Sequence, residues 1–345
     1  MINWSVRTTL GFLLALIILI GGGAYWFSSK KAPMPDIDIV MAIPAPTMTF
    51  SAHFIAHDAG FYKKEGLNVS DRNLVGVAST NAVIAGSADF TEGTGATFLR
   101  AVANGQKLFA IATLVNKPMV ELVIRKDIAD AAGITDKTPV NERLKVMKGK
   151  TIAIQGVGSI IHAMQRLTAR RVGLDPDNDV RVAPMNPPEM LPALKSKQID
   201  GYATSLPFTT QSIVSGDAVM LASGPAGDMP EYTPQDYVVL YTRPEVCQKE
   251  RIKCEKMARA SKAATDFILQ KPNDALELMR KRFGKMDPKV LDAAWAVVSK
   301  AHSPDSKVTL KGLENSQKFS IDAGLLEPKD VLKDFKGVYT DEYLK

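Results

Sequence analysis

The chain has 345 residues, and its 43 Lys and Arg against 37 Asp and Glu leave a formal charge of +6, which is modest for this length. Basic and acidic residues are interleaved instead of clustered, a pattern typical of a solvated surface, which argues against a nucleic-acid-binding role. Beyond an apolar N-terminal segment, roughly 310 residues of mixed composition remain, enough for two ordinary domains.

The N-terminus carries an uncharged apolar run from Leu10 to Phe27, which is followed by Lys30 and Lys31. We interpret residues 1–31 as a targeting segment outside the fold. As a helix the run would span roughly 27 Å, close to the thickness of a bilayer, so it predicts either a cleaved signal peptide or an uncleaved membrane anchor. The body is therefore expected in the periplasm or on the outer face of the cytoplasmic membrane.

Residues 36–124 alternate short apolar runs with amphipathic stretches, the pattern of an α/β lobe. The pattern predicts strands at 37–43, 67–74, 88–91 and 107–115, and helices at 51–66, 78–85 and 96–103. Residues 120–125 read as an extended segment that leaves this lobe. We assign 36–124 to the first part of lobe 1.

A second series of the same kind follows in residues 125–236, which we assign to lobe 2. After a polar, irregular stretch, it predicts strands at 151–155, 180–184, 201–204 and 218–223, and helices at 160–172, 187–197 and 208–215. A strand at 237–242 would cross back to lobe 1. From residue 250 the strand signals vanish, so 237–345 is interpreted as the return to lobe 1 followed by C-terminal helices.

The two cysteines, Cys247 and Cys254, are separated by six residues. On one continuous helix they would lie about 10 Å apart, too far for a disulfide. A bridge therefore requires Cys247 to precede the helix, which Pro244 and an exported location favour. The sequence leaves the pairing open, and two thiols without a nearby His do not indicate a metal site.

Residues 51–69, SAHFIAHDAGFYKKEGLNV, resemble the signature of the nitrate/sulfonate/taurine-type (NitT/TauT, NMT1/THI5-like) solute-binding proteins of ABC transporters. Further matches follow in order at 86–90, 147–153, 156–159 and 194–202. The resemblance covers roughly residues 37–300. It implies an α/β, periplasmic-binding-protein-like fold of type II, in which two Rossmann-like lobes flank a cleft, are joined by hinge crossovers and are followed by C-terminal helices.

In open α/β sheets, ligands bind outside the carboxyl ends of strands, so the loops that follow the strands hold the candidate site. In proteins of this family these loops face one another across the cleft, which implies closure around a solute. The candidate ligand-binding residues are Thr47, Met48, Phe50, Glu92, Thr94, Gly95, Gln155, Gly158, Ser159, Ile160, Ser205 and Phe208.

These residues point to different ligands. The glycines before Ser159 let backbone amides and a helix N-terminus approach an anion, although Ser159 is equally explained as a helix N-cap. Glu92 favours a cationic solute, or an ion pair within the protein. Met48, Ile160 and Phe208 favour a solute with an apolar or aromatic body. The sequence thus leaves a sulfonate-like or carboxylate-like anion and a heteroaromatic compound open.

Two histidines, His53 and His57, share a helix face at a spacing that can hold a metal, but two ligands are insufficient. We therefore expect no metal, no cofactor and no catalytic residue, and no His-supported nucleophile is evident. The leading hypothesis is the extracytoplasmic, monomeric binding component of an ABC importer, which passes a small solute to permease subunits. The alternatives are an enzyme of the same fold acting on a pyrimidine-like substrate, and a ligand-sensing receptor.

Overall fold

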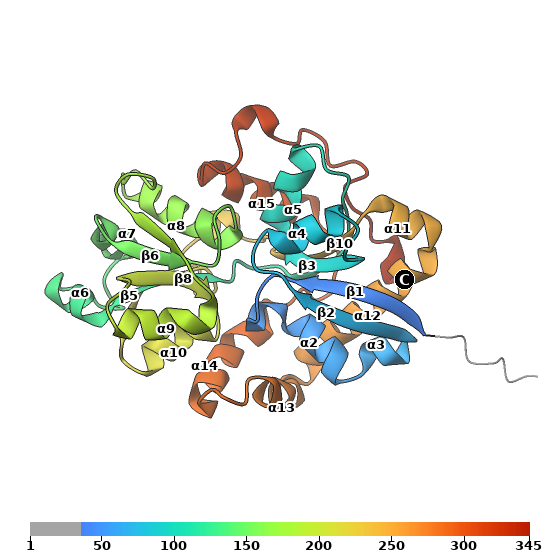
Figure 1. Ribbon diagram of the computed structural model, residues 1–345, viewed down its shortest axis with the longest axis horizontal. Coiled ribbons are helices and arrows are strands. Elements are labelled where there is room, and N and C mark those ends of the chain that lie inside the picture. The colour runs from blue at the N-terminus through green and yellow to red at the C-terminus, as the bar shows by residue number, and fades with distance from the viewer. Residues whose placement is uncertain (1–35) are drawn as a thin grey trace, which may run out of the picture. The chain divides into compact units, whose positions relative to one another are not determined.

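The computed structural model describes residues 36–345, and the predicted targeting segment at 1–31 lies outside this range. Residues 37–345 form one compact unit built on two five-stranded sheets (Figure 1). The first sheet has the order β2 (Leu67–Asn73), β1 (Ile37–Ile43), β3 (Phe90–Thr94), β10 (Val238–Thr242) and β4 (Phe109–Val115). The second has the order β7 (Arg181–Pro184), β6 (Thr151–Ile154), β8 (Gly201–Ser205), β5 (Val120–Arg125) and β9 (Ala218–Ser223).

The two sheets have the same topology. In each, parallel strands are interrupted by one antiparallel strand, β10 in the first sheet and β5 in the second. Each of these strands belongs to a segment that passes between the lobes. The inner strands of each sheet are largely buried, whereas the edge strands β2 and β7 are mostly exposed or half-exposed.

The helices of lobe 1 are α2 (Ser51–Asp58), α3 (Phe61–Lys64), α4 (Ala78–Ile84) and α5 (Gly95–Ala103). Those of lobe 2 are α6 (Lys126–Ala131), α7 (Val140–Leu144), α8 (Ile160–Arg171), α9 (Pro187–Lys195) and α10 (Phe208–Val214). The C-terminal region holds α11 (Pro244–Lys249), α12 (Arg251–Gln270), α13 (Pro272–Arg282), α14 (Pro288–Val298) and α15 (Leu310–Asp322). Short 3₁₀ turns are η1 (Met48–Phe50), η2 (Lys145–Met147), η3 (Pro230–Tyr232), η4 (Ser299–Ala301), η5 (Pro328–Asp330) and η6 (Glu342–Leu344).

Some elements differ from the sequence-based expectation. The helix predicted at 51–66 is divided into α2 and α3 by Gly60, whose φ of 74° lies in the left-handed region. The strand predicted at 88–91 instead runs to Thr94, because Glu92 and Thr94 pair with the antiparallel strand β10. The stretch at 127–147, which was expected to be irregular, contains α6 and α7.

The crossings between the lobes lie side by side. β5 belongs to the second sheet, where it pairs with β8 and β9, so the first crossing is at 116–119 and not after residue 124 as the sequence suggested. The second crossing follows β9 and ends at β10. The amide of Gln235 donates to the carbonyl of Asn116 at 3.0 Å, and the amide of Tyr237 to that of Val115 at 2.9 Å. These bonds join the two crossings into one narrow hinge.

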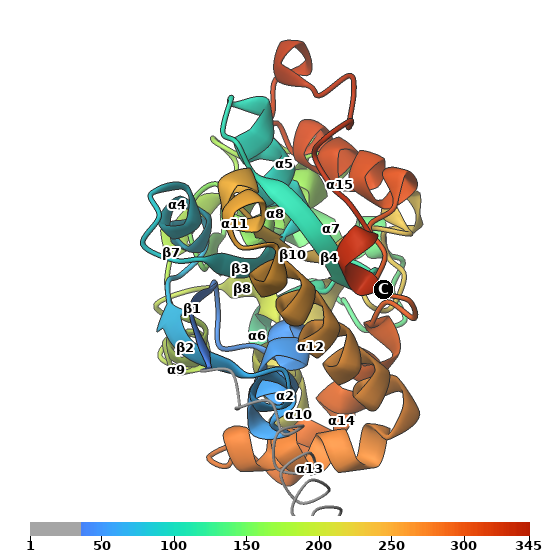
Figure 2. The ribbon, with the colours of Figure 1, turned by 90° about the vertical axis from the view of Figure 1, so that its right-hand side faces the viewer.

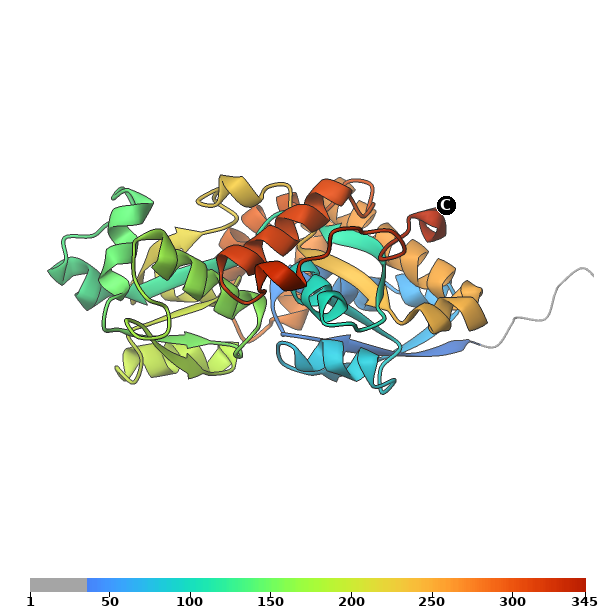
Figure 3. The ribbon, with the colours of Figure 1, turned by 90° about the horizontal axis from the view of Figure 1, so that it is seen from above.

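The C-terminal helices pack against both lobes. α12 packs on α2, α3 and β4 of lobe 1, and Figure 2 shows it alongside β4. α14 contacts α10 of lobe 2. α15 contacts α5 of lobe 1 and α8 of lobe 2, and Figure 3 shows it lying across both. The C-terminal region therefore does not simply cover lobe 1.

Cys247 and Cys254 form a disulfide, with Cα atoms 5.6 Å apart. Cys247 lies in α11 and Cys254 in α12, and the helical path breaks between them at Glu250, where φ and ψ are −135° and 64°. The break satisfies the condition derived from the spacing, since the cysteines do not share one continuous helix. Within residues 36–345, no helix is both long and apolar enough to span a bilayer.

Candidate functional site

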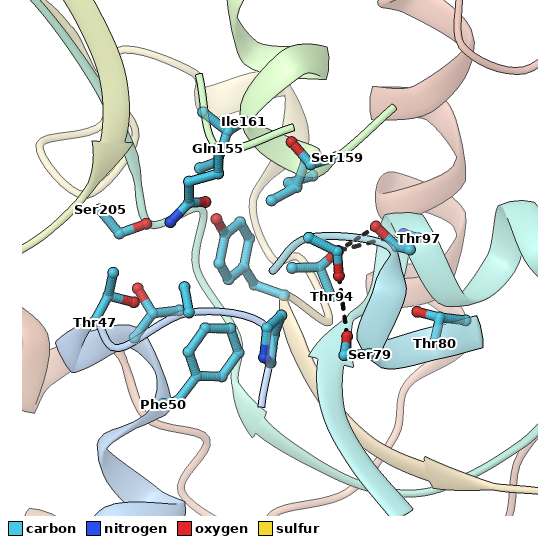
Figure 4. A pocket seen from close by; sticks show the side chains of 16 residues that line it. Thr47, Phe50, Ser79, Thr80, Thr94, Thr97, Gln155, Ser159, Ile161 and Ser205 are labelled. Atoms are coloured by element: carbon cyan, nitrogen blue, oxygen red, sulfur yellow. Dashed lines mark hydrogen bonds between the residues drawn. The ribbon is translucent and has the colours of Figure 1, made fainter. Parts of the chain in front are cut away.

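A cavity lies between the two lobes, at the carboxyl ends of the strands (Figure 4). From lobe 1 it is lined by Pro44, Ala45, Thr47, Thr49, Phe50, Gly76, Ser79, Thr80, Thr94 and Thr97, from lobe 2 by Gln155, Ser159, Ile160, Ile161 and Ser205, and from the second crossing by Tyr237. The free space is ≈ 30 Å³. Since a water molecule needs roughly 10–15 Å³ by this measure, the lobes lie nearly closed on each other.

The lining is uncharged and combines polar with apolar groups. Eight Ser and Thr residues, Gln155 and Tyr237 supply polar groups, while Phe50, Ile160 and Ile161 supply apolar surface, and no Lys, Arg, Asp, Glu or His among the described residues lines it. Burial raises the pKa of Tyr237 far above the usual range, so its hydroxyl stays neutral. Figure 4 shows the side chains of Gln155 and Ser205 turned toward each other. The cavity is thus suited to a polar ligand recognised by hydrogen bonds.

Helix N-termini from both lobes meet at this cavity. Thr94 is the N-cap of α5, where its Oγ1 accepts from the amide of Thr97 at 3.3 Å. Ser159 is the N-cap of α8, where its Oγ accepts from the amide of His162 at 3.2 Å. The first amides of a helix have no partner inside it, and the helix dipole places partial positive charge at the same end. Both helices therefore favour negative charge in the cavity.

Several buried polar atoms of the lining lack hydrogen-bond partners among the described residues. They are Oγ1 of Thr47, Oγ1 of Thr49 and Nε2 of Gln155. Thr47 and Thr49 are only 1% and 2% exposed. An unsatisfied buried polar group costs roughly 1–3 kcal/mol, and native proteins rarely retain one without reason. A bound polar molecule would supply the missing partners.

The cavity brings together part of the residues that the sequence singled out. Those that line it are Thr47, Phe50, Thr94, Gln155, Ser159, Ile160 and Ser205. The remaining candidates, which do not line it, are Met48, Glu92, Gly95, Gly158 and Phe208. Nine of the twelve follow strand ends, whereas Glu92 and Thr94 lie in β3 and Ser205 is the last residue of β8.

The residues outside the lining have other contacts. The amide of buried Met48 donates to the carbonyl of Leu206 at 2.9 Å, a backbone bond between the lobes beside the cavity. The carbonyl of Phe208 accepts from Tyr202 at 2.8 Å. Gly95 lies against the backbone of Asp236, so a Cβ there would be 2.0 Å from the Asp236 carbonyl oxygen.

Glu92 faces the interior of lobe 1, not the cavity. It is 0% exposed, and neither carboxyl oxygen has a hydrogen-bond partner in the described part of the chain. Burial raises its pKa well above the usual range, and the negative charge of Asp71 adds to the shift. Because Glu92 is enclosed in lobe 1 away from the cavity, it does not contact the space where a solute would bind, and it forms no ion pair within the described residues.

The lining residues that were not among the candidates are Pro44, Ala45, Thr49, Gly76, Ser79, Thr80, Thr97, Ile161 and Tyr237. Ser79 and Thr80 follow the end of β2, so applying the strand-end rule to that loop as well would have found them. Thr97 and Ile161 lie in the first turns of α5 and α8, which follow the candidate residues Thr94 and Ser159. Tyr237 comes from the second crossing, for which no strand-end rule exists.

The family comparison agrees with this architecture. A family model described as NMT1/THI5-like matches residues 47–275. The chain belongs to the NMT1/THI5-like family. No curated protein matches the sequence.

Solved structures similar to this NMT1/THI5-like chain confirm the periplasmic-binding-protein-like fold. A Bordetella bronchiseptica RB50 protein is 23% identical, with a TM-score of 0.75 over 89% of this chain and 95% of its own. The alkanesulfonate-binding protein SsuA from Xanthomonas axonopodis pv. citri, bound to MOPS, is 17% identical, with a TM-score of 0.66 over 87% and 97%. The nitrate-binding protein NrtA from Synechocystis PCC 6803 is 15% identical, with a TM-score of 0.67 over 91% and 88%.

The two histidines of the NMT1/THI5-like signature segment have structural contacts. Buried His53 has Nδ1 3.0 Å from the Tyr62 hydroxyl and Nε2 3.0 Å from an Asp71 carboxylate oxygen. His57 is exposed beside Asp58, with Nδ1 3.2 Å from its carboxylate. No group of three or more His, Cys, Asp or Glu able to hold a metal occurs in residues 36–345.

Proposed function

We propose that this protein is the extracytoplasmic solute-binding component of an ABC importer and that its solute is a small organic anion carrying a sulfonate or carboxylate group. The observation that carries the proposal is a set of buried donors at the interlobe cavity, Thr47, Thr49 and Gln155, that have no hydrogen-bond partner within residues 36–345. Free hydroxyls and an amide that converge from two lobes are what a bound oxyanion requires.

The electrostatic surroundings of the cavity favour a negatively charged ligand. The positive ends of α5 and α8 point at it, and no acidic side chain lines it. Helix N-termini with adjacent hydroxyls are common binding sites for oxyanions. Two proteins of the same fold are described as binding an alkanesulfonate and nitrate, which are both anions.

In this proposal, closure of the two lobes around the solute is the step that prepares it for transport. The narrow hinge at residues 116–119 and 224–237 lets the lobes part, and a solute that contacts both lobes stabilises the closed form by its differential affinity for that form. The closed form would then dock on permease subunits. We propose that the protein acts as a monomer in the periplasm or at the outer face of the cytoplasmic membrane, where the segment at 1–31 would deliver or tether it.

A thermal-shift screen of the protein against sulfonates, carboxylates, nitrate, amines and pyrimidines tests this function. A solute at 100 times its Kd should stabilise the folded state by about 2.7 kcal/mol. We expect a shift with sulfonates or carboxylates and recovery of the solute unchanged. Stabilisation only by amines or pyrimidines would overturn the proposed anion class, and a chemically altered solute would favour an enzyme of the same fold.

A further inference from the structure

A second, larger cavity of ≈ 350 Å³ adjoins the first and shares Thr80 and Thr97 with it. Its walls are α4 and α5 of lobe 1 and Val157 of lobe 2. Asn81, Asn104 and Gln106 line it with side-chain amides, and Arg100 is its one charged lining residue. A solute held in the first cavity could therefore extend past the two threonines into a space that ends at a guanidinium.

Arg100 differs from the other arginines that are withdrawn from solvent. Each of the other buried or half-buried arginines of residues 36–345 forms an ion pair with a carboxylate; these are Arg125, Arg143, Arg166, Arg243, Arg259 and Arg280. The half-buried Arg100 has neither an ion pair nor a hydrogen bond within the same range. Burial lowers its pKa, but an arginine remains charged throughout the physiological range.

The guanidinium of Arg100 lies close to another positively charged feature of the protein. Its Nη2 atom lies 3.4 Å from where a Cβ on Gly158 would stand, so the guanidinium reaches from lobe 1 to the loop of lobe 2 that precedes α8. That loop leads into the positive N-terminus of α8, which begins after Ser159. A cation beside a positive helix end, with no carboxylate of the described residues paired to it, favours an anion bound between the two.

Resting on the proposed function, we infer that Arg100 forms a second anionic subsite, and that the natural solute is a small organic molecule with two acidic groups. One acidic group would bind to the hydroxyls and helix ends of the first cavity. The other would pair with the Arg100 guanidinium in the second. Thr97 and Arg100 are three residues apart on α5, about 4.5 Å along its axis, so the two groups belong on a short carbon chain.

Calorimetric titration with matched ligand pairs tests this inference. The pairs are 3-sulfopropionate with propane-1-sulfonate and glutarate with butyrate, which differ chiefly in the second acidic group. In the unaltered protein we expect the dianion of at least one pair to bind at least about tenfold more tightly, the value of one charge-assisted hydrogen bond. In Arg100→Gln that advantage should disappear, while the affinity for the monoanion stays within about twofold.

The control is Arg181→Gln, which removes the same charge at the amino end of β7, away from the cleft. It should leave the preference for the dianion unchanged. If monoanions bind and dianions gain nothing, or if Arg100→Gln weakens both members of a pair equally, the second subsite is overturned and the proposed function stands. If neither member of either pair binds while another class in the wider screen does, both proposals fail.

Discussion

The amide of Met48 in lobe 1 donates a 2.9 Å hydrogen bond to the carbonyl of Leu206 in lobe 2. Met48 follows Thr47, and Leu206 follows Ser205, so the bond joins the two loops that carry cavity-lining hydroxyls. It forms only while the lobes are together. The exchange rate of this single amide therefore reports the opening of the cleft.

We predict that a saturating solute slows hydrogen exchange at the Met48 amide, because the solute stabilises the closed form in which the bond exists. Amide exchange followed by mass spectrometry or NMR measures the effect. The amide of Ile111, in the buried strand β4 of lobe 1, serves as the reference and should change much less. Equal protection of both amides would indicate general stabilisation without closure.

Thr49→Val should raise stability and lower affinity at once. The Thr49 hydroxyl is buried without a partner, so replacing it with a methyl group removes a desolvation penalty of roughly 1 kcal/mol or more from the unliganded protein. The same change removes a hydrogen-bonding group from the cavity and should weaken solute binding by about tenfold. Denaturant unfolding and calorimetric titration measure the two effects.

The matched control for this variant is Thr91→Val. Thr91 is equally buried, but its Oγ1 donates to the carbonyl of Ala42 at 2.7 Å, away from the cavity. This variant should lose roughly 1 kcal/mol of stability and keep its solute affinity. If Thr49→Val proves as destabilising as Thr91→Val, the Thr49 hydroxyl has a partner in solution and does not await a ligand.

Glu92→Gln should stabilise the protein at neutral pH and have little effect in acid. The Glu92 pKa is raised in the folded state above its ordinary value of 4.5. At pH values above 4.5 the unfolded chain has therefore lost a proton that the folded protein must bind. This costs stability as pH rises from the unfolded pKa to the folded one, by about 1.4 kcal/mol per pH unit. Glutamine mimics the neutral carboxyl without titrating.

Urea unfolding of wild type and Glu92→Gln between pH 4 and pH 8 measures this difference. The variant's advantage should be small at pH 4, where both states of the wild type bind the proton, and should grow above that. Parallel curves across the range would show that Glu92 is ionised in the folded protein.

Replacing both Cys247 and Cys254 with Ala should reduce the free energy of unfolding by about 2–3 kcal/mol, since the bridge closes a short loop between α11 and α12. Thermal unfolding with and without a reducing agent measures the loss. Reductant should lower the Tm of the wild type toward that of the variant and leave the variant unchanged. Two free thiols titrated in the folded, untreated protein would contradict the disulfide.

Many strands and helices of the fold could be predicted from local sequence patterns. The alternation of apolar runs with amphipathic stretches located β1 and β6, because a buried parallel strand must be apolar and a covering helix must have one polar face. Ser159, considered as an N-cap, marked the start of α8 for a similarly local reason. Seven of the twelve candidate ligand residues come from the resulting loops and line the cavity.

The sequence by itself therefore determined two α/β lobes, their strand-end loops and the family, since these depend on residues near one another in the chain. Only the tertiary structure decided that β5 joins the second sheet, that Tyr237 lines the cavity, that Glu92 faces the core and that Arg100 has no ion-pair partner within residues 36–345. The reason is physical. Strand pairing, side-chain direction and desolvation depend on residues distant in sequence, and no local pattern specifies what will lie opposite them.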